Sequence, residues 1–186
     1  MEQNPCTFGP TLEREPAADA LGLEPGALDL TMPVQEVSTG LATVVIAVRA
    51  LADLRGIDPD MAAIRAFLRG AESARNMLVV CPEPYEEHQR VAARMFAPDL
   101  GVPEDPATGS ANGAFAGYVL KHRYSQHWGE AERPFSVGQG YEVGRPSNLR
   151  IDAVWQGDVT RIRVGGRVAR VAVGEWLALA NAGSAA

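Results

Sequence analysis

Residues 104–111 read Glu-Asp-Pro-Ala-Thr-Gly-Ser-Ala and combine acids, a rigid turn and a glycine directly before a predicted helix. Pro106 restricts Asp105 to extended geometry, because an α conformation before proline would clash. The first N–H groups of a helix have no internal partners and carry a partial positive charge, and Gly109 lets a ligand approach them closely. Asp105 can shuttle or orient a proton, and the Ser110 hydroxyl can donate or accept a hydrogen bond. The segment therefore predicts a site that binds an anion and moves a proton.

A second interpretation of the same residues is purely structural. Asp105 and Thr108 are residue types that cap and brace helix starts, and caps far outnumber anion sites. Residue types alone therefore favour a cap. Glu104, the neighbouring acid, is expected to point away from Asp105, because successive side chains in an extended segment face opposite ways.

The predicted helix after residue 110 is apolar nearly all round. One face carries its larger apolar residues together with two alanines: Ala111, Ala114, Phe115, Tyr118 and Val119. Gly113, Ala116 and Gly117 occupy other positions and permit close approach by surrounding backbone. A helix of this kind is predicted to be buried, which suits a curved sheet wrapped around it.

Four strands are expected before this helix, at residues 34–37, 42–48, 77–81 and 89–96. Two further helices are expected, at residues 17–21 and 58–70, the second with Asp58 as its N-cap. Residues 1–10 are expected to form a linker or an edge strand.

Several short strands are expected in residues 133–180. Their predicted turns fall at residues 138–140, 157–158 and 165–166, and residues 160–174 form a hairpin candidate with alternating charged and apolar residues. Strands, one central helix and more strands indicate an α+β fold rather than a doubly wound sheet.

The composition sets the class of protein. The chain has 186 residues, enough for one domain with its own core, and 46% hydrophobic and 22% charged residues are ordinary for a soluble globular protein. The net charge is −6 and Lys121 is the only lysine, so nucleic-acid and anionic-membrane partners are not expected.

No targeting or membrane signal is evident in the sequence. No apolar run approaches the roughly 20 residues of a membrane span, and residues 1–10 lack the basic start and apolar stretch of a signal peptide. A cytoplasmic location is therefore expected. Cys6 and Cys81 make neither a disulfide framework nor a metal cluster. His88, His122 and His127 are scattered among polar residues and are expected at the surface, so no metal is expected.

Residues 94–111, RMFAPDLGVPEDPATGSA, resemble the signature of the phenazine-biosynthesis PhzF family of isomerases and epimerases. The family pattern R-x-F-x-P-x-x-G-x-x-E-D-P-A-T-G-S-A is matched at every specified position. Other family-like pieces flank it in the right order: residues 35–41 (QEVSTGL), 139–140 (QG), 144–147 (GRPS) and 164–166 (VGG). The match covers nearly the whole chain.

The resemblance implies a fold similar to diaminopimelate epimerase. In that fold each of two similar domains wraps a mixed or antiparallel curved sheet around a central helix, and the active site lies between the domains. Residues 1–186 would form a single domain, equivalent to the C-terminal half of such a two-domain isomerase.

The resemblance also implies roles for the residues of the signature. The catalytic Asp and Ser of the family fall on Asp105 and Ser110. Thr108 and Gly109 would belong to the substrate-binding helix start, where the amides of Gly109 and Ser110 would hold the substrate's acidic group. Neither cysteine lies near this motif, which disfavours a racemase with two catalytic thiols.

The resemblance places a second substrate-binding loop, Ser38, Thr39 and Gly40, near the same pocket. Residue types alone favour a plain β-turn there, although its hydroxyls and turn offer an anion site. Residues 138–140 and 144–147 are explained equally well as pocket lining or as turns.

The family's first domain supplies a glutamate that moves the substrate proton and a Gly-His motif, and neither is found in this chain. Glu104 is not expected to replace that glutamate. A partner chain carrying the first domain, or a homodimer, would have to complete the site. Half of such a protein is expected to expose apolar surface that a partner covers, which predicts an oligomer.

The function implied is a PhzF-like isomerase or epimerase subunit, which transfers a proton on a small, amino-acid-like carboxylate metabolite without a cofactor. Two alternatives stay open. One is a non-catalytic binding or assembly module derived from this domain, and the other is a hydrolase on the same scaffold.

Overall fold

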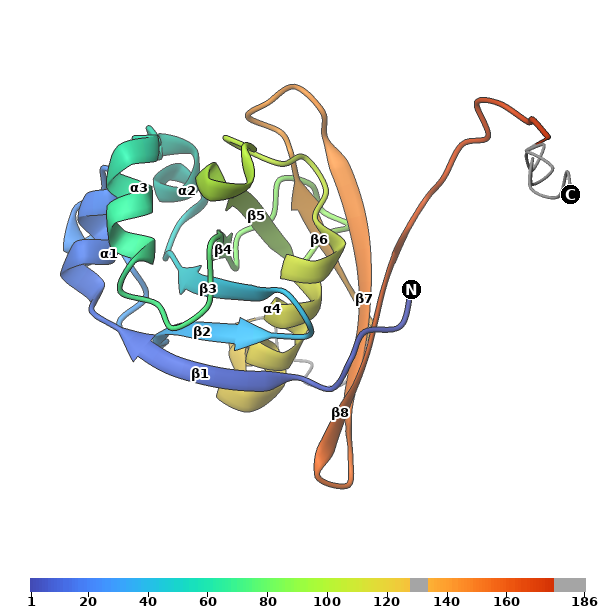
Figure 1. The fold of residues 1–186 in the computed structure, drawn as a ribbon, viewed down its shortest axis with the longest axis horizontal. Coiled ribbons are helices and arrows are strands. Elements are labelled where there is room, and N and C mark those ends of the chain that lie inside the picture. Colours follow the sequence, from blue (N-terminus) through green and yellow to red (C-terminus); the bar gives the residue numbers. More distant parts are fainter. Residues whose placement is uncertain (128–133, 176–186) are drawn as a thin grey trace, which may run out of the picture.

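The computed structural model describes residues 1–127 and 134–175 and places eight strands in one sheet, whose order follows the order along the chain. The strands are β1 (Thr7–Leu12), β2 (Val34–Ser38), β3 (Ala42–Ala47), β4 (Met77–Cys81), β5 (Val91–Phe96), β6 (Phe135–Gln139), β7 (Ser147–Gln156) and β8 (Val159–Gly166). β3 and β4 pair in parallel, as do β5 and β6, and the other neighbours are antiparallel. The sheet curls strongly, as Figure 1 shows.

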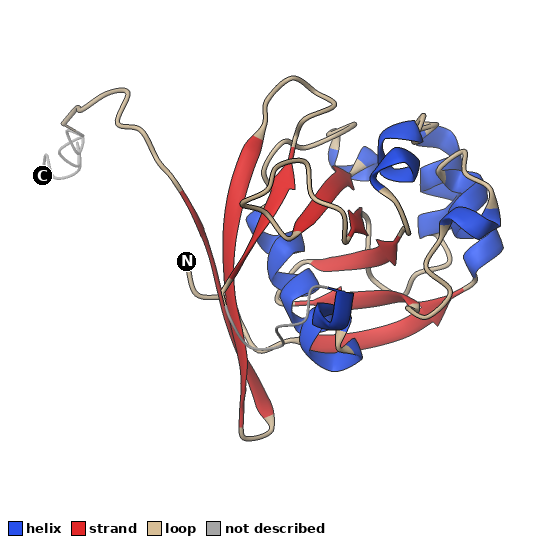
Figure 2. Ribbon diagram, turned by 180° about the vertical axis from the view of Figure 1, so that it is seen from behind, coloured by secondary structure: helices blue, strands red, loops and turns tan. Residues whose placement is uncertain are grey.

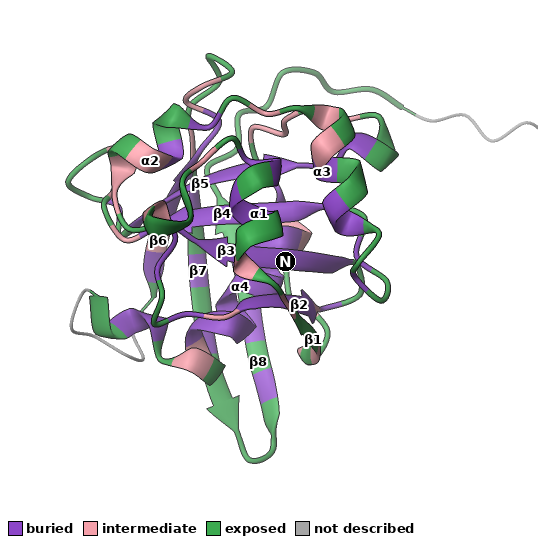
Figure 3. Ribbon diagram, turned by 90° about the vertical axis from the view of Figure 1, so that its left-hand side faces the viewer, coloured by how far each residue is buried: buried purple, intermediate pink, exposed green. Residues whose placement is uncertain are grey.

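The helix α4 (Gly109–His122) lies inside the curve and contacts β2, β3 and β4 as well as β7 and β8. Residues 111–119 are all buried, as a helix without a polar face requires. In Figure 3 β2 to β5 are also largely buried, whereas β7 and β8 alternate between buried and exposed residues. The predicted α+β fold, a curved mixed sheet around a central helix, is confirmed.

The N-terminal segment, residues 1–6, closes the gap between the first and last strands (Figure 1). The backbone N–H of Gln3 donates to Ile162 O at 2.9 Å, and that of Val164 donates to Met1 O at 2.9 Å. The predicted linker or edge strand is thus a short edge pairing with β8, followed by β1.

Three glycines of α4 make room for the N-terminal segment. A Cβ at Gly109 would lie 3.0 Å from Met1 Cε, and one at Gly113 would lie 2.8 Å from Gln3 Oε1. A Cβ at Gly117 would overlap Cys6. Glycines spaced four residues apart lie on one helix face, so they form a groove into which the segment fits.

The convex side of the first five strands carries α1 (Arg14–Ala20), α2 (Leu51–Gly56) and α3 (Met61–Leu68). A second core, separate from that around α4, lies beneath these helices and includes Leu21, Ile46, Leu54, Ile64 and Phe96. Figure 2 shows α1, α2 and α3 gathered on this side of the sheet, where no helix of the described residues covers β7 and β8. Three short 3₁₀ turns complete the fold: Pro25–Ala27, Pro98–Leu100 and Tyr124–His127.

The hairpin prediction for residues 160–174 is wrong. The hairpin is β7–β8, with Gly157 at φ +64° in the predicted turn, and Gly165–Gly166 belong to β8 rather than to a turn. Residues 167–175 leave the body as an extended tail (Figure 1), and no described residue pairs with them as a strand. The valines of this tail are almost fully exposed, Val168 at 98%, Val171 at 95% and Val173 at 82%.

The remaining differences are small. α3 begins at Met61, and its N-cap is Asp60, whose Oδ1 accepts a hydrogen bond from Ala62 N at 2.8 Å, instead of the predicted Asp58. The short helix α2 was not predicted. Residues 138–139 belong to β6, so the predicted turn begins only at Gly140. No helix in the described part of the chain is long and apolar enough to cross a bilayer.

Candidate active site

The segment 102–108 is pinned between β5, β6 and the start of α4. The N–H of Asp105 donates to Met95 O on β5 at 3.0 Å. On the other side Gly140, at φ +84°, lies so close that a Cβ there would come within 2.8 Å of Pro106 Cα. Only glycine tolerates that combination. The loop that carries Asp105 is therefore held by backbone contacts on both sides.

Thr108 is the N-cap residue of α4, with φ −104° and ψ 105°. Its side chain does not cap the helix, however: within the described residues it makes no capping hydrogen bond. The hydroxyl donates instead to Asp105 Oδ2 in a short hydrogen bond. The N–H groups of the first turn are therefore left without a side-chain cap, so the predicted capping by Thr108 is absent, whereas the bracing part of the structural interpretation stays open.

Gln139, at the end of β6, and Asn112, on α4, brace this arrangement from within, and both are 0% exposed. The Nε2 of Gln139 donates to Asp105 O at 2.6 Å and to Thr108 Oγ1 at 3.1 Å. Asn112 Nδ2 donates to Thr108 O at 2.8 Å. Asp105 and Thr108 are thus held in one hydrogen-bonded cluster that joins the loop, the sheet and the helix.

Glu104 points away from this cluster, as predicted. Its two carboxylate oxygens accept hydrogen bonds from Arg94 Nε at 3.0 Å and Arg94 Nη2 at 2.8 Å. The pair is nearly inaccessible, with side chains 5% and 8% exposed. Arg94 Nη1 also donates to Leu54 O and Ile57 O. Glu104 therefore ties the loop to β5 and to the chain after α2.

A cleft of about 470 Å³ opens beside the start of α4. Ala107 and Gly109 form one wall together with Met1, and residues 146–149 and 164–167 form the others. Pro146 and Ser147 thus line the pocket, one of the two uses considered for residues 144–147, whereas Gln139 is internal. A ligand in this cleft would lie against the partial positive charge of the helix start.

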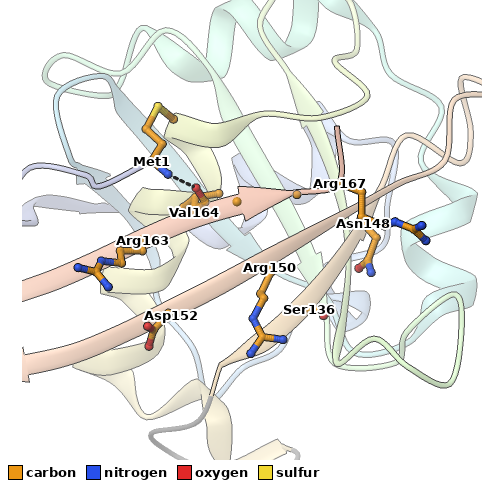
Figure 4. Close-up of a pocket in the computed structure, with 10 residues that line it drawn as sticks. Met1, Ser136, Asn148, Arg150, Asp152, Arg163, Val164 and Arg167 are labelled. Carbon is orange, nitrogen blue, oxygen red and sulfur yellow. Dashed lines mark hydrogen bonds between the residues drawn. The ribbon is translucent and has the colours of Figure 1, made fainter. Parts of the chain in front are cut away.

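A second hollow of about 450 Å³ lies across the end of β8 and shares Asn148, Val164 and Arg167 with the first. Figure 4 shows the exposed guanidinium groups of Arg150 and Arg163 around it. Asp105 and Ser110 line neither hollow, but Ala107 and Gly109, their neighbours in the chain, line only the first, so the first cleft is the candidate active site.

Ser110 lies in the first turn of α4 and is half-buried. The loop Ser38–Gly40 sits farther along the same helix. Thr39 Oγ1 donates to Gln3 Oε1 at 3.3 Å, and Gln3 packs on Gly113. Ser38 Oγ accepts a hydrogen bond from Gly40 N at 3.0 Å, as in a plain turn. Ser38, Thr39 and Gly40 do not line the cleft beside Gly109, so their role in binding stays a prediction.

The family model for PhzC-PhzF, described as phenazine biosynthesis-like protein, matches residues 1–174. The chain belongs to this family. The curated relatives include a trans-2,3-dihydro-3-hydroxyanthranilate isomerase of Pseudomonas aeruginosa, 33% identical over 83% of this chain and 50% of that protein. An uncharacterized isomerase of Deinococcus radiodurans is 33% identical over 86% of this chain and 50% of that protein. The chain thus spans about half the length of the curated relatives it matches.

Solved PhzF-family structures share the fold. A Bacillus anthracis phenazine biosynthesis protein of the PhzF family superimposes with a TM-score of 0.78 at 26% identity, over 89% of this chain and 56% of the other. A predicted epimerase of Pseudomonas aeruginosa gives a TM-score of 0.65 at 25% identity, over 91% of this chain and 58% of the other. The predicted epimerase-like fold is therefore confirmed.

In this member of the PhzF family the two cysteines lie away from the start of α4, and their thiols are not activated for acid–base chemistry. Cys81 is fully buried in the core beneath α1–α3, and Cys6 packs beside Gly117, two turns along α4 from Gly109. Burial raises the pKa of each thiol to about 12. Both are thiols at neutral pH and weak nucleophiles.

The histidines are all remote from Asp105. His88 and His127 are exposed, as predicted, beside Glu86 (3.4 Å) and Asp29 (3.1 Å). His122 is half-buried, contrary to prediction, and its Nε2 lies 2.7 Å from Gln35 Oε1 at the far end of α4.

Sequence reasoning missed the bracing roles of Gln139 and Asn112. One signal for Asn112 was available, since it is a lone amide in a helix otherwise built of small and apolar residues. Such a residue must find polar partners when buried. Gln139 offered no comparable signal, because its partners lie 27 to 34 residues away along the chain.

Proposed function

We propose that the chain is the Asp105-bearing half of a PhzF-like isomerase, which moves a proton between carbon atoms of a small carboxylate metabolite without a cofactor. The observation that carries the proposal is the start of α4. There an Asp carboxylate, held in place by Thr108, and the Ser110 hydroxyl lie at a helix terminus without a side-chain cap, and the neighbouring residues Ala107 and Gly109 line a cleft of about 470 Å³.

The helix start is the proposed binding site for the substrate's carboxylate. The N–H groups of Gly109 and Ser110 belong to the first turn of a 14-residue helix, where the backbone dipoles favour an anion. The hydroxyl of Ser110 would add a further donor. A relative named for dihydrohydroxyanthranilate, an amino-acid-like carboxylate, fits this substrate class.

The proposed reaction is a balanced proton transfer. A base removes a proton from one carbon, the electron pair shifts along the substrate, and an acid returns a proton to another carbon, so no oxidant or reductant is needed. Asp105 would carry or orient the proton on this side of the substrate. Glu104 is engaged with Arg94 and cannot serve as the second group.

The second proton-transferring group is therefore proposed to come from a first domain on a partner chain. One observation supports a partner: residues 167–175 expose three valines along an extended segment. Exposed apolar segments of this kind mark association surfaces.

The decisive experiment is native mass analysis of the protein purified from its own cells without a tag on any partner. We expect a second chain of similar size to co-purify, and the assembly to incorporate deuterium from heavy water into a carboxylate metabolite. A homodimer without deuterium uptake would favour the alternative, a binding or assembly module, which the exposed tail also suits. A monomer at micromolar concentration by light scattering would contradict both.

A further inference from the structure

The amide of Gln139 has all of its hydrogen-bonding capacity engaged at the candidate site. Its Nε2 donates two hydrogen bonds, to Asp105 O at 2.6 Å and Thr108 Oγ1 at 3.1 Å. Its Oε1 accepts two, from Asn112 Nδ2 at 2.9 Å and, more weakly, from Thr108 N at 3.4 Å. A side-chain amide can form two bonds of each kind. Since Gln139 is fully buried, water cannot replace any of them.

The orientation of this amide follows from its partners. The backbone N–H of Thr108 can only donate, and the backbone carbonyl of Asp105 can only accept. Exchanging the oxygen and nitrogen of Gln139 would place a donor against a donor and an acceptor against an acceptor. The nitrogen of Gln139 therefore faces Asp105 O and the Thr108 hydroxyl.

This orientation sets the direction of the Thr108 hydroxyl. Its oxygen accepts a hydrogen from Gln139, so its own proton is directed to Asp105 Oδ2. Thr108 is only 8% exposed, which limits competition from water. Among the described residues, Asp105 Oδ1 accepts no hydrogen bond. The two oxygens of the carboxylate are thus unequal.

We propose that Gln139 is a positioning residue, which fixes the Thr108 hydroxyl as the donor to Asp105 Oδ2 and so leaves Oδ1 to exchange the substrate proton. Asn112 anchors the amide of Gln139 to α4. The statement about Oδ1 rests on the proposed function, but the direction of the hydroxyl does not. Bracing the loop requires only the hydrogen bonds of Gln139 to backbone atoms, Asp105 O and Thr108 N. The hydrogen bond to Thr108 Oγ1 is different, because it acts on the side chain that contacts Asp105.

The test is the NMR signal of the Thr108 hydroxyl proton in the isotopically labelled chain. A buried hydroxyl bonded to a carboxylate exchanges slowly enough to give a downfield signal. We expect that signal in the wild type and in Thr108→Ser, which keeps the hydroxyl, and its loss in Thr108→Val and in Gln139→Met. A folded Gln139→Met that retains the signal would overturn the inference.

Gln35 supplies a matched control. It is also a buried glutamine on a strand, 5% exposed, with Nε2 donating to Gly9 O at 3.0 Å and Oε1 near His122. Gln35→Met should keep the Thr108 hydroxyl signal even where it lowers stability, and its loss there would overturn the assignment to Gln139. If Gln139→Met does not fold, Gln139→Leu also removes the donor, and loss of the signal is again expected.

A kinetic measurement separates this inference from the proposed function. In the active assembly, Gln139→Met should lower kcat on the order of tenfold with little change in KM, since it acts on proton transfer rather than on binding. If the assembly has no activity, the proposed function fails while the hydroxyl result still decides the orientation. If the hydroxyl signal disappears and kcat is unchanged, the positioning role is overturned and the proposed function stands.

Discussion

The two ends of α4 differ. At the C-terminal end Arg123 adopts the left-handed conformation, φ 55°, and its N–H donates a hydrogen bond to Val119 O. At the N-terminal end the Thr108 hydroxyl donates to Asp105 Oδ2 and not to a group of the helix. The C-terminal end is also packed with rings: Tyr118 contacts His122 at 4.7 Å and Tyr124 at 6.2 Å between centroids. The N-terminal end adjoins a cleft. The comparison teaches that one end serves stability and the other keeps its partial charge available to a ligand.

The largest effect is expected at the packed end. Tyr118→Ala should lower the free energy of unfolding by about 3–5 kcal/mol, the usual cost of deleting a buried aromatic ring, because Tyr118 is fully buried and its hydroxyl donates to Pro33 O at 2.7 Å. Urea denaturation measures the loss. Trp155→Ala, at a side chain 45% exposed, is the control with little change. A loss under about 1 kcal/mol for Tyr118→Ala would contradict the assignment of this end to stability.

The loop before α4 should depend on one buried ion pair. Glu104→Ala leaves the Arg94 guanidinium, 5% exposed, without its carboxylate, and removing one partner of a buried pair costs about 3 kcal/mol. The double variant Arg94→Met with Glu104→Leu should recover part of that loss, as measured by denaturation midpoints. If the double variant is as unstable as the sum of the single variants, the two side chains do not act as a pair.

At the N-terminal end of α4, substitutions should lower activity strongly and stability only slightly. Asp105→Asn and Ser110→Ala should each lower deuterium uptake by the reconstituted enzyme about 100-fold or more, equivalent to roughly 2.7 kcal/mol in the transition state. The free energy of unfolding should change by less than about 1 kcal/mol, because Asn still accepts the hydrogen bond from Thr108. Asp58→Asn, at an exposed position, is the control. Unchanged uptake in both variants would remove Asp105 and Ser110 from the reaction.

The smallest effect concerns pH and the C-terminal end of α4. Burial, aided by the charge of Lys121, lowers the pKa of His122 below its ordinary 6.5. The unfolded chain then binds a proton more readily than the folded one, so stability is complete above pH 6.5 and declines as the pH falls through the folded pKa. His122 is half-exposed, so we expect only a few tenths of a kcal/mol. The difference in denaturation midpoint between pH 7.5 and pH 5 should shrink in His122→Gln, and an equal difference in both proteins would refute the assignment.

The sequence predicted those features of the molecule that depend on neighbouring residues. The helix start beside Thr108 and the buried character of α4 follow from residues within one segment, and both are present. β-Branched runs likewise identified β2, β3 and β4. Short-range chemistry thus indicated the fold class, whereas the family resemblance was needed to favour a site over a helix cap at Asp105 and Thr108.

Features that depend on residues far apart could not be predicted in this way. The alternating residues 167–173 read as a strand, but strand formation needs a neighbouring edge, and the described residues provide none. Gln139 and Glu104 have roles only because β6 and β5 come beside the loop. Whether a buried amide braces a site or merely fills a core depends on those distant partners.

The pairing of the N-terminal segment with β8 has a consequence for how the protein acquires its shape. Cys6 N donates to Thr160 Oγ1, and these residues are 154 positions apart in the sequence. The contact therefore closes a loop that contains most of the chain. Contacts of such long range carry a large closure entropy and form late. During vectorial synthesis α4 and the early strands can collapse first, but the cleft wall built by residues 164–167 must wait for the end of the described chain. The appearance of the cleft is therefore a kinetic reporter of completed folding.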